Sequence, residues 1–387
     1  MRRSLLPLLL LLAGGCAGDG VGILDVAPGG DAAAFAAHLE AALPGEMAAF
    51  GIPGMAVALL EHGQVAWSRG FGLADPVRGV PVDPSGTVFQ VASLSKPVVA
   101  WAVARLAEEG RLDLDAPVES VLTRWHFPES DFDVSAVTAR RLLSHTAGTS
   151  IHGYLGFDPD VPLPTLEASL DGATLGLGPV RLIADPGRGW RYSGGGYTVL
   201  QLLVEEVTGR PFAEHMRDAV LQPLGMTSSA FDWADGLRPR TAVPHSVRDA
   251  PLPNYLYRAQ AAAGLYSTLS DYARFVVASM DGAGGGGVLP GPVAQGLHAR
   301  ADAAVGYGLG HQRFTLADGR VLVGHVGLNR GWRAFWLMEP AAGSGIVVLS
   351  NSQDVYDLPS RTICAWTRAV LSATIVFPVG IAGCQGR

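Results

Sequence analysis

Residues 89–100, FQVASLSKPVVA, contain Lys96, the only lysine of the chain. The chain has 28 basic residues, so every other one is an arginine. Apolar residues recur at helical spacing after Lys96, and Pro97 is tolerated only in the first turn of a helix. The stretch therefore predicts a helix that begins near Ser93. Residues three apart share one helical face, so Ser93 and Lys96 should point into the same space.

A serine hydroxyl next to an amine is a candidate nucleophile and base. Serine is weakly nucleophilic until a base takes its proton, and lysine can act as that base when it is neutral, whereas arginine stays protonated. The lysine pKa must then fall from ~10.4 to about 7, which corresponds to roughly 4–5 kcal/mol. A helix terminus contributes only ~0.3–1 kcal/mol, so burial must supply most of the shift. The alternative is a Ser-x-x-Lys pattern that arose by chance.

Two further motifs carry candidate catalytic groups. RYSGGGY at 191–197 places Tyr192 before a helical stripe, and a phenol near a lysine can serve as a second acid or base. GHVG at 324–327 places His325 on an expected strand. The structural alternatives are a turn tyrosine and a core histidine.

Composition narrows the class of protein. The chain has 387 residues, 48% of them apolar and 16% charged, which fits a globular protein of one large or two ordinary domains. The net charge is −7 and the arginines are scattered, so no nucleic-acid partner is expected. No internal repeat is evident.

The N-terminal residues read as an export signal. Residues 1–16, MRRSLLPLLLLLAGGC, combine two arginines, a short apolar run and small residues before Cys16, as in a signal peptide with a lipobox-like end. Cys16 is a candidate lipidation site, and the alternative is an ordinary signal peptide. We expect a linker over 17–34 and a periplasmic or membrane-anchored lipoprotein of a bacterium.

The C-terminal end leaves two questions open. Cys364 and Cys384 allow at most one disulfide within the mature chain, and the sequence leaves open whether they pair. The apolar tail at 372–387 has no assigned role.

Strand and helix patterns alternate in a mixed architecture. Two β-rich runs at 54–72 are joined by His62-Gly63, a plausible hairpin, and helical stripes dominate the middle third. Three strands are expected at 321–327, 332–338 and 345–351, followed by a helix around 361–371. The pattern predicts an α/β (α+β) fold with one antiparallel sheet built from N- and C-terminal segments, helices packed on it and an inserted, mostly helical region.

Seven blocks in this order resemble the serine β-lactamase-like superfamily, in its class C β-lactamase, D,D-carboxypeptidase and esterase branch. The blocks are FQVASLSK, RLDLDAPVESVL, ARRLLSHTAGTS, YSGGGYTVLQLLVEEVTGRPF, AAAGLYSTLSDYARF, VGYGLG and GHVGLNRGW. The resemblance covers residues 35–371, which we expect to form the hydrolase domain, and implies the β-lactamase/transpeptidase-like fold.

The resemblance implies a role for each motif residue. Ser93 corresponds to the acylated nucleophile, Lys96 to its base and Tyr192 to a proton shuttle. His325 stands where many members have the lysine of Lys-Thr-Gly. The backbone N–H groups of Ser93 and Leu328 would form the oxyanion hole. No metal and no organic cofactor are implied.

Two departures from the family pattern bear on the substrate. Gly194 replaces the asparagine of the Tyr-x-Asn motif, and His325 is mostly neutral at pH 7 where a lysine would be a fixed cation. Gly194 removes an amide that would usually contact the substrate or the lysine. Loss of the fixed cation at His325 favours an esterase or a peptidase over a dedicated β-lactamase, although Arg330 is close enough in sequence to supply a charge. Five residues are candidate substrate contacts: Gly194, Gly327, Asn329, Arg330 and Trp332. Ser144 and His145 read as helix-end and loop residues.

The resulting expectation is a serine hydrolase that cleaves carboxylic esters or amides through an acyl-enzyme on Ser93. The alternatives are a β-lactamase and a penicillin-binding or sensor module that does not turn over. Expected partners are a small-molecule ester, peptide or β-lactam, with membrane association through a lipidated N-terminus and a monomeric state.

Overall fold

The computed structural model describes residues 21–375 except 247–249, 281–282, 302–305 and 354–356. The expected signal peptide, Cys16, Cys384 and most of the C-terminal tail lie outside these residues. None of the helices in the described part of the chain combines the length and apolar character that a bilayer span needs.

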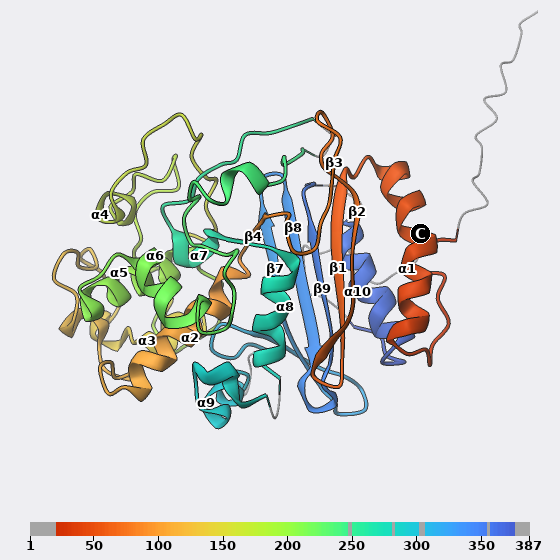
Figure 1. Ribbon diagram of the computed structural model, residues 1–387. Coiled ribbons are helices and arrows are strands. Elements are labelled where there is room, and N and C mark those ends of the chain that lie inside the picture. The colour runs from red at the N-terminus through yellow and green to blue at the C-terminus, as the bar shows by residue number, and fades with distance from the viewer. Residues whose placement is uncertain (1–20, 247–249, 281–282, 302–305, 354–356, 376–387) are drawn as a thin grey trace, which may run out of the picture.

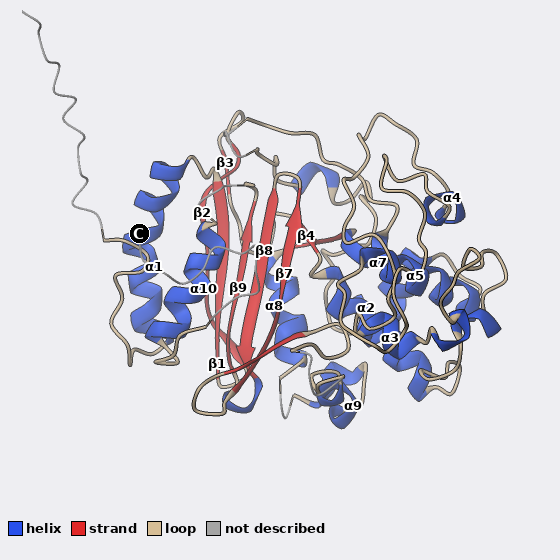
Figure 2. Cartoon of the chain, turned by 180° about the vertical axis from the view of Figure 1, so that it is seen from behind, coloured by secondary structure: helices blue, strands red, loops and turns tan. Residues whose placement is uncertain are grey.

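The described residues form one large antiparallel sheet and a region that is mostly helical (Figures 1 and 2). The strands are β1 Gly54–Glu61, β2 Gln64–Asp75, β3 Val80–Pro81, β4 Phe89–Ala92, β5 Leu265–Ser267, β6 Gln312–Thr315, β7 Val321–Asn329, β8 Trp332–Glu339 and β9 Ser344–Ser350. The α-helices are α1 Ala32–Phe50, α2 Ser95–Glu108, α3 Ala139–Leu143, α4 Leu166–Leu170, α5 Gly194–Thr208, α6 Phe212–Met216, α7 Gln260–Ala263, α8 Leu269–Ala278, α9 Gly291–Gly296 and α10 Leu358–Ala369. Short 3-10 and π turns are Val118–Ser120, Val134–Ala136, Arg217–Leu221, Arg238–Arg240, Gly284–Gly287 and Pro340–Ala342.

The sheet joins the two ends of the chain, as expected. Its strand order is β3-β2-β1-β9-β8-β7-β6, and β4 pairs separately with β5. N-terminal β1 lies beside C-terminal β9, with Met55 opposite Ser350. The β1–β2 hairpin turns at His62 and Gly63, whose φ angles of 53° and 72° are typical of a tight hairpin turn. The expected fold class is confirmed.

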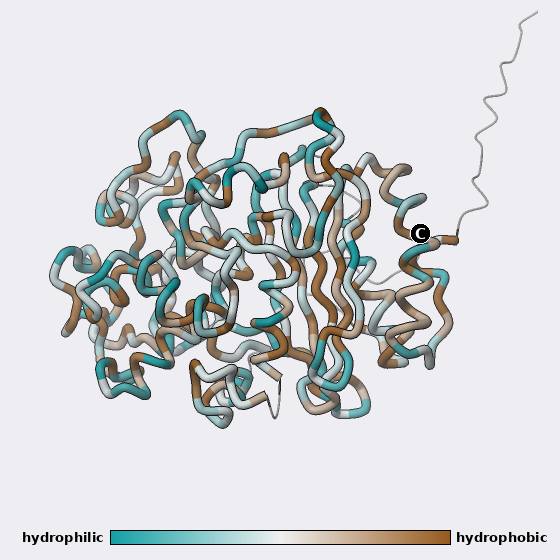
Figure 3. The backbone as a smooth tube through the Cα atoms, viewed as in Figure 1, coloured by the Kyte–Doolittle hydropathy of each residue, from teal (hydrophilic) through white to brown (hydrophobic). Residues whose placement is uncertain are grey.

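Apolar side chains are buried on both faces of the sheet. Along β1, Ala56 and Ala58 face the helical region, whereas Val57 and Leu59 face α1 and α10. Successive strand residues point to opposite faces, so a strand covered on both sides must be apolar throughout. Figure 3 shows this as brown central strands between the two helical layers.

The expected linker over 17–34 differs from the structure in its second half. Ile23 is fully buried under α1, and Asp31 caps that helix by accepting a hydrogen bond from the Ala34 N–H at 2.8 Å. The backbone N–H groups of Gly29 and Gly30 donate to the carbonyl of Ala369 at the end of α10. An apolar side chain and a capping residue therefore attach this segment to the domain.

Candidate active site

Ser93 lies in the turn between β4 and α2, just before the N-cap residue Leu94. Ala92 precedes it with a φ of 52°, a left-handed conformation that is uncommon for alanine. The turn is held by two hydroxyls: Ser95 Oγ donates to the Ala92 carbonyl at 2.6 Å, and the Tyr272 hydroxyl donates to the Leu94 carbonyl at 3.0 Å. The strained turn places Ser93 at the end of the helix, within two residues of the expected start.

Lys96 is almost fully buried beside Ser93, with 1% of its surface exposed. Its Nζ lies 3.0 Å from Ser93 Oγ and donates to the carbonyl of Ala262 at 2.7 Å. No carboxylate forms an ion pair with Lys96 in the described part of the chain. Burial lowers the pKa of Lys96 well below its usual value. The expected proximity of the two side chains, with a buried amine, is confirmed.

Tyr192 lies over Lys96 at the start of the Gly-rich segment. Lys96 Nζ is 4.8 Å from the centre of the Tyr192 ring, and the Ser93 side chain is near enough to the Tyr192 hydroxyl to offset part of the rise in its pKa. Burial raises the pKa of Tyr192, so the phenol keeps its proton at neutral pH. Ser93, Lys96 and Tyr192 are thus within reach of one reacting atom.

His325 is buried on β7, with its ring centre 6.2 Å from that of Tyr192. Its Nδ1 lies 2.8 Å from the carbonyl of Val326, which can only accept, so Nδ1 carries the proton. Its Nε2 therefore accepts from the hydroxyl of Tyr307 at 2.9 Å. Burial, and secondarily the charge of Lys96, lower the pKa of His325 well below its usual value. His325 is a neutral, fully hydrogen-bonded side chain.

The free edge of β7 provides a second backbone donor. The pairing of β6 with β7 ends at Gly324, so no described strand pairs with the following residues on that edge. Asn329 and Trp332 flank a two-residue hairpin turn and form its hydrogen-bonded pair, so Leu328 is a position whose N–H points away from β8. Val326 lies two residues before Leu328, so its backbone groups point to the same edge of β7. Its carbonyl accepts a hydrogen bond from His325 there and not from β8. The Leu328 N–H is therefore available at this edge.

Gly327 allows that edge to approach the nucleophile turn. A Cβ on Gly327 would lie 2.4 Å from the carbonyl oxygen of Val91 and 3.0 Å from Leu94 Cδ1. Only glycine permits this approach of β7 to the turn that carries Ser93.

Comparison with known proteins shows the family of the chain. Residues 39–362 match the family model described as Beta-lactamase. The chain belongs to this family. The expected family is thus confirmed.

Several known proteins are similar to the chain. It is 36% identical over 229 residues to Esterase EstB of Burkholderia gladioli, covering 56% of each chain. It is 27% identical over 342 residues to the D-aminopeptidase of Gluconobacter oxydans (strain 621H), covering 86% of this chain and 62% of the relative. The chain thus spans little more than half the length of these curated relatives. The structure of the octameric penicillin-binding protein homologue from Pyrococcus abyssi has a TM-score of 0.73 at 24% identity, covering 87% of this chain and 78% of that chain, and shows the shared fold.

Two expected substrate contacts, Trp332 and Asn329, pack inward in the structure. Trp332 is fully buried and packs edge-on against Phe89, with ring centres 6.1 Å apart, so it belongs to the core. Asn329 is buried and its Nδ2 donates to Gln90 Oε1 at 2.9 Å and to the Ala263 carbonyl at 3.2 Å. Residues 329 and 332 pair with each other at the turn, where their side chains pack inward, which differs from the expected contact with substrate.

Gly194 and Arg330, two further expected substrate contacts, have different surroundings in the structure. A Cβ on Gly194 would lie 3.2 Å from the His152 carbonyl and 3.3 Å from a ring carbon of Tyr154, so the loop at 152–154 fills the space around this position. Arg330 is exposed, and its guanidinium carbon lies 3.8 Å from the centre of the Tyr255 ring. At the mouth of the site, Trp190 is 43% exposed and its ring lies 6.3 Å from that of Tyr192.

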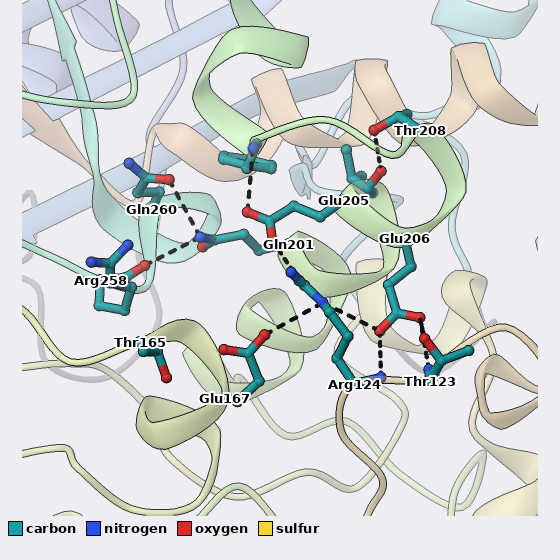
Figure 4. A network of polar contacts seen from close by, with 12 residues as sticks. Thr123, Arg124, Thr165, Glu167, Gln201, Glu205, Glu206, Thr208, Arg258 and Gln260 are labelled. Atoms are coloured by element: carbon teal, nitrogen blue, oxygen red, sulfur yellow. Dashed lines mark hydrogen bonds and ion pairs between the residues drawn. The ribbon is translucent and has the colours of Figure 1, made fainter.

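Sequence reasoning missed the residues that hold Lys96 and Tyr192 in place. The Lys96 acceptor is a backbone carbonyl of α7, which carries no sequence signal. Gln201 of α5 holds α7 by accepting from the Ala261 N–H at 3.1 Å. Its side-chain amide also donates to Gln260 Oε1 at 3.3 Å (Figure 4). His145, expected to be a loop residue, lies in the site itself, with its ring centre 4.2 Å from that of Tyr192.

No group of three or more His, Cys, Asp or Glu side chains in the described residues is arranged to bind a metal ion.

Proposed function

We propose that this protein is a serine hydrolase that cleaves carboxylic esters or amides through an acyl-enzyme on Ser93. The observation that carries the proposal is the buried Lys96 Nζ, 3.0 Å from Ser93 Oγ and without a carboxylate partner in the described residues. A desolvated amine is a base at neutral pH, and the hydroxyl it contacts becomes the nucleophile. The names of the relatives, an esterase and a D-aminopeptidase, support the same class.

The geometry supports a reaction in two steps. Lys96 takes the Ser93 hydroxyl proton while Oγ attacks the substrate carbonyl carbon, and the N–H groups of Ser93 and Leu328 hold the oxyanion. Tyr192 donates its proton to the leaving alcohol or amine as the carbonyl–leaving-group bond breaks, and regains a proton from Lys96. Water then attacks the acyl carbon, releases the acid and restores the Ser93 hydroxyl.

The neutral environment of the site favours substrates other than β-lactams. β-Lactams carry a carboxylate, which a fixed cation would hold, whereas His325 is neutral and both of its ring nitrogens are occupied. We therefore expect nitrocefin turnover far below ester turnover. A nitrocefin turnover comparable to ester turnover would favour the β-lactamase alternative.

Covalent labelling combined with turnover tests the proposal. A fluorophosphonate probe should label the wild type, which should also hydrolyse p-nitrophenyl butyrate in steady state, and Ser93→Ala should do neither. Labelling without turnover would instead identify the sensor alternative, and full activity of Ser93→Ala would overturn the assignment of the nucleophile.

The role of Lys96 needs its own variant. Lys96→Arg keeps a cation but not a removable proton, so labelling should fall by at least about 10²-fold, the usual range for loss of a general base. Circular dichroism would verify the fold, and Lys96→Met would show whether a smaller apolar residue behaves alike. Wild-type labelling in either folded variant would contradict the base assignment.

We further propose that the protein is exported and carries a lipid on Cys16. The sequence of residues 1–16 motivates this, and Cys364 is disulfide-bonded, which fits an oxidising compartment. Metabolic labelling with palmitate should modify the wild type and leave Cys16→Ser unlabelled, and fractionation should recover Cys16→Ser in the periplasm. Cytoplasmic wild type without lipid would overturn the proposal.

We expect a monomer, which size-exclusion chromatography with light scattering checks.

A further inference from the structure

His145 packs directly against the ring of Tyr192. The two ring centres are 4.2 Å apart, closer than those of His145 and Tyr307 at 4.9 Å or Tyr197 at 5.2 Å. His145 follows the end of α3 with a φ of 60°, a conformation that histidine and asparagine adopt more readily than most residues. Only 2% of His145 is exposed, so its ring has one fixed place in the site.

His145 also holds the backbone on both sides of Tyr192. The N–H of Arg191 donates to the His145 carbonyl at 2.8 Å. The N–H of Ser193 donates to His145 Nδ1 at 3.1 Å. One residue therefore fixes the backbone before Tyr192, the backbone after it and the face of its ring.

We propose that His145 is the positioning residue for Tyr192, which holds the phenol at Ser93 for proton transfer to the leaving group. The proposal rests on the proposed hydrolase function, because it needs Tyr192 to act in the reaction. His145 acts through Tyr192 and touches no substrate atom in this arrangement.

The hydrogen bond from Ser193 requires an unprotonated Nδ1, so His145 must be neutral. Burial lowers the pKa of His145 well below its usual value, and a proton on the neighbouring Lys96, His325 or His152 would lower it further. The other ionisable groups whose rings pack against it are Tyr192, Tyr197 and Tyr307, which are neutral phenols because burial raises the pKa of each. Protonation at low pH would put a hydrogen on Nδ1 and remove the contact with Ser193.

Two substitutions separate the contacts of His145. His145→Asn tolerates a positive φ and offers its amide oxygen near the place of Nδ1, so it keeps the acceptor and loses the ring. His145→Phe keeps an aromatic ring and loses the acceptor. With p-nitrophenyl butyrate, we expect kcat to fall roughly 10²-fold in His145→Phe and about 10-fold or less in His145→Asn, with KM within about threefold, since general-acid loss is worth ~10²–10⁴.

A double-mutant cycle with Tyr192→Phe is the decisive measurement. If His145 acts through Tyr192, its substitution should have little effect on kcat when the phenol hydroxyl is already absent. His145→Asn and His145→Phe should therefore each change kcat of Tyr192→Phe by less than about threefold. A purely structural His145 would lower kcat by the same factor in both backgrounds, and that result would overturn the proposal.

Two further measurements complete the test. His152 also packs on Tyr192, at 4.9 Å, but its ring accepts no N–H bond in the described residues, so His152→Asn should lose less kcat than His145→Asn. An equal or greater loss in folded His152→Asn would contradict the special role of His145. If Tyr192→Phe itself retained full kcat, the proposed function would fail at Tyr192, whereas an impaired Tyr192→Phe with a fully active His145→Phe would refute only the inference.

Discussion

At the scale of single residues, Lys96 is unusual because it is almost fully buried and has no carboxylate partner in the described part of the chain. A lysine is rarely fully buried without a carboxylate, because its charged form loses the solvation of water. Here a serine hydroxyl, one carbonyl and two tyrosine rings surround the nitrogen. The neutral amine fits these neighbours, because one N–H donates to the Ala262 carbonyl and the nitrogen lone pair is close enough to take the Ser93 hydroxyl proton during the reaction.

The lowered pKa of Lys96 gives a pH dependence with a definite sign. The neutral amine is the base, so kcat/KM should rise with pH as Lys96 loses its proton and should level off well below pH 10.5, the ordinary lysine value. The contribution of the neutral lysine to the free energy of unfolding is largest above its unfolded pKa and declines as pH falls towards its folded pKa.

A pH–rate profile with p-nitrophenyl butyrate and urea unfolding at the same pH values would check both dependences. Lys96→Met should abolish the activity, and its free energy of unfolding should depend less on pH over the alkaline range. A wild-type rise centred at pH 10 or above would contradict a desolvated lysine.

The residues that sequence reasoning found are those with unusual chemistry in recognisable spacing. Ser93, Lys96, Tyr192 and His325 stand in motifs, and the structure brings their side chains together. The sequence predicted only a loop position for His145, because its contacts to Arg191 and Ser193 join segments that are distant in the chain. The left-handed Ala92 could not be read from the sequence either, because alanine gives no signal for a positive φ.

At the scale of elements, α7 is a short helix that depends on α5 for its position. Gln201 is buried and satisfies the Ala261 N–H, one residue before the carbonyl that accepts from Lys96. Gln201→Leu would leave that N–H unsatisfied, which costs about 1–3 kcal/mol of unfolding free energy. Since the Lys96 acceptor would shift, kcat should fall roughly 10- to 100-fold.

Urea unfolding and ester kinetics measure the two effects of Gln201→Leu. The exposed Gln222, which lies outside the site, offers a matched control, and Gln222→Leu should change the unfolding free energy by less than about 0.5 kcal/mol. Wild-type kcat in Gln201→Leu would show that α7 keeps its place without this clamp.

The contact between β7 and the nucleophile turn predicts a second effect. Gly327→Ala would put a methyl group 2.4 Å from the Val91 carbonyl, a backbone atom that cannot rotate away. We expect β7 to move off the turn, with a loss of about 1–3 kcal/mol in unfolding free energy and about 10²-fold or more in kcat, as for the loss of one oxyanion donor.

The control for Gly327→Ala is Gly45→Ala in α1, where a Cβ meets nothing within 4 Å. It should be neutral or slightly stabilising, because alanine favours helices more than glycine does. A Gly327→Ala protein with normal kcat would indicate that the Leu328 N–H is not needed.

Helix and strand periods predicted most elements, since β1, β2, β7, β8 and β9 carry strong strand patterns. The sequence did not show which side chains near the β7–β8 turn face the core, and Trp332 and Asn329 were assigned to the substrate for that reason. Their inward packing depends on Phe89 and Gln90, which lie more than two hundred residues earlier in the chain.

At the scale of the whole molecule, helices cover both faces of the sheet, and the site lies on the side away from α1 and α10 (Figure 1). Residues 21–31 secure that outer layer, because Ile23 is buried and Arg368 Nη1 donates to the Leu24 carbonyl at 2.8 Å. A chain that starts at residue 35 loses one buried isoleucine, worth about 1.5–3 kcal/mol, and the Asp31 cap, worth about 1 kcal/mol.

Compared with a chain that starts at residue 21, the shorter chain should therefore have a Tm lower by several degrees, with unchanged kcat at 25 °C because the site lies on the other face. Scanning calorimetry and ester kinetics measure this difference. Equal Tm values would show that residues 21–34 are a linker after all.

The pairing of β1 with β9 also sets the timing of activity. Met55 can meet Ser350 only after the chain has been made through β9, and contacts between such distant segments form slowly. A nascent chain therefore carries Ser93 and Lys96 early but lacks β7, whose Leu328 N–H would complete the oxyanion hole. Hydrolytic activity should therefore appear only after β7, β8 and β9 have been made and have paired.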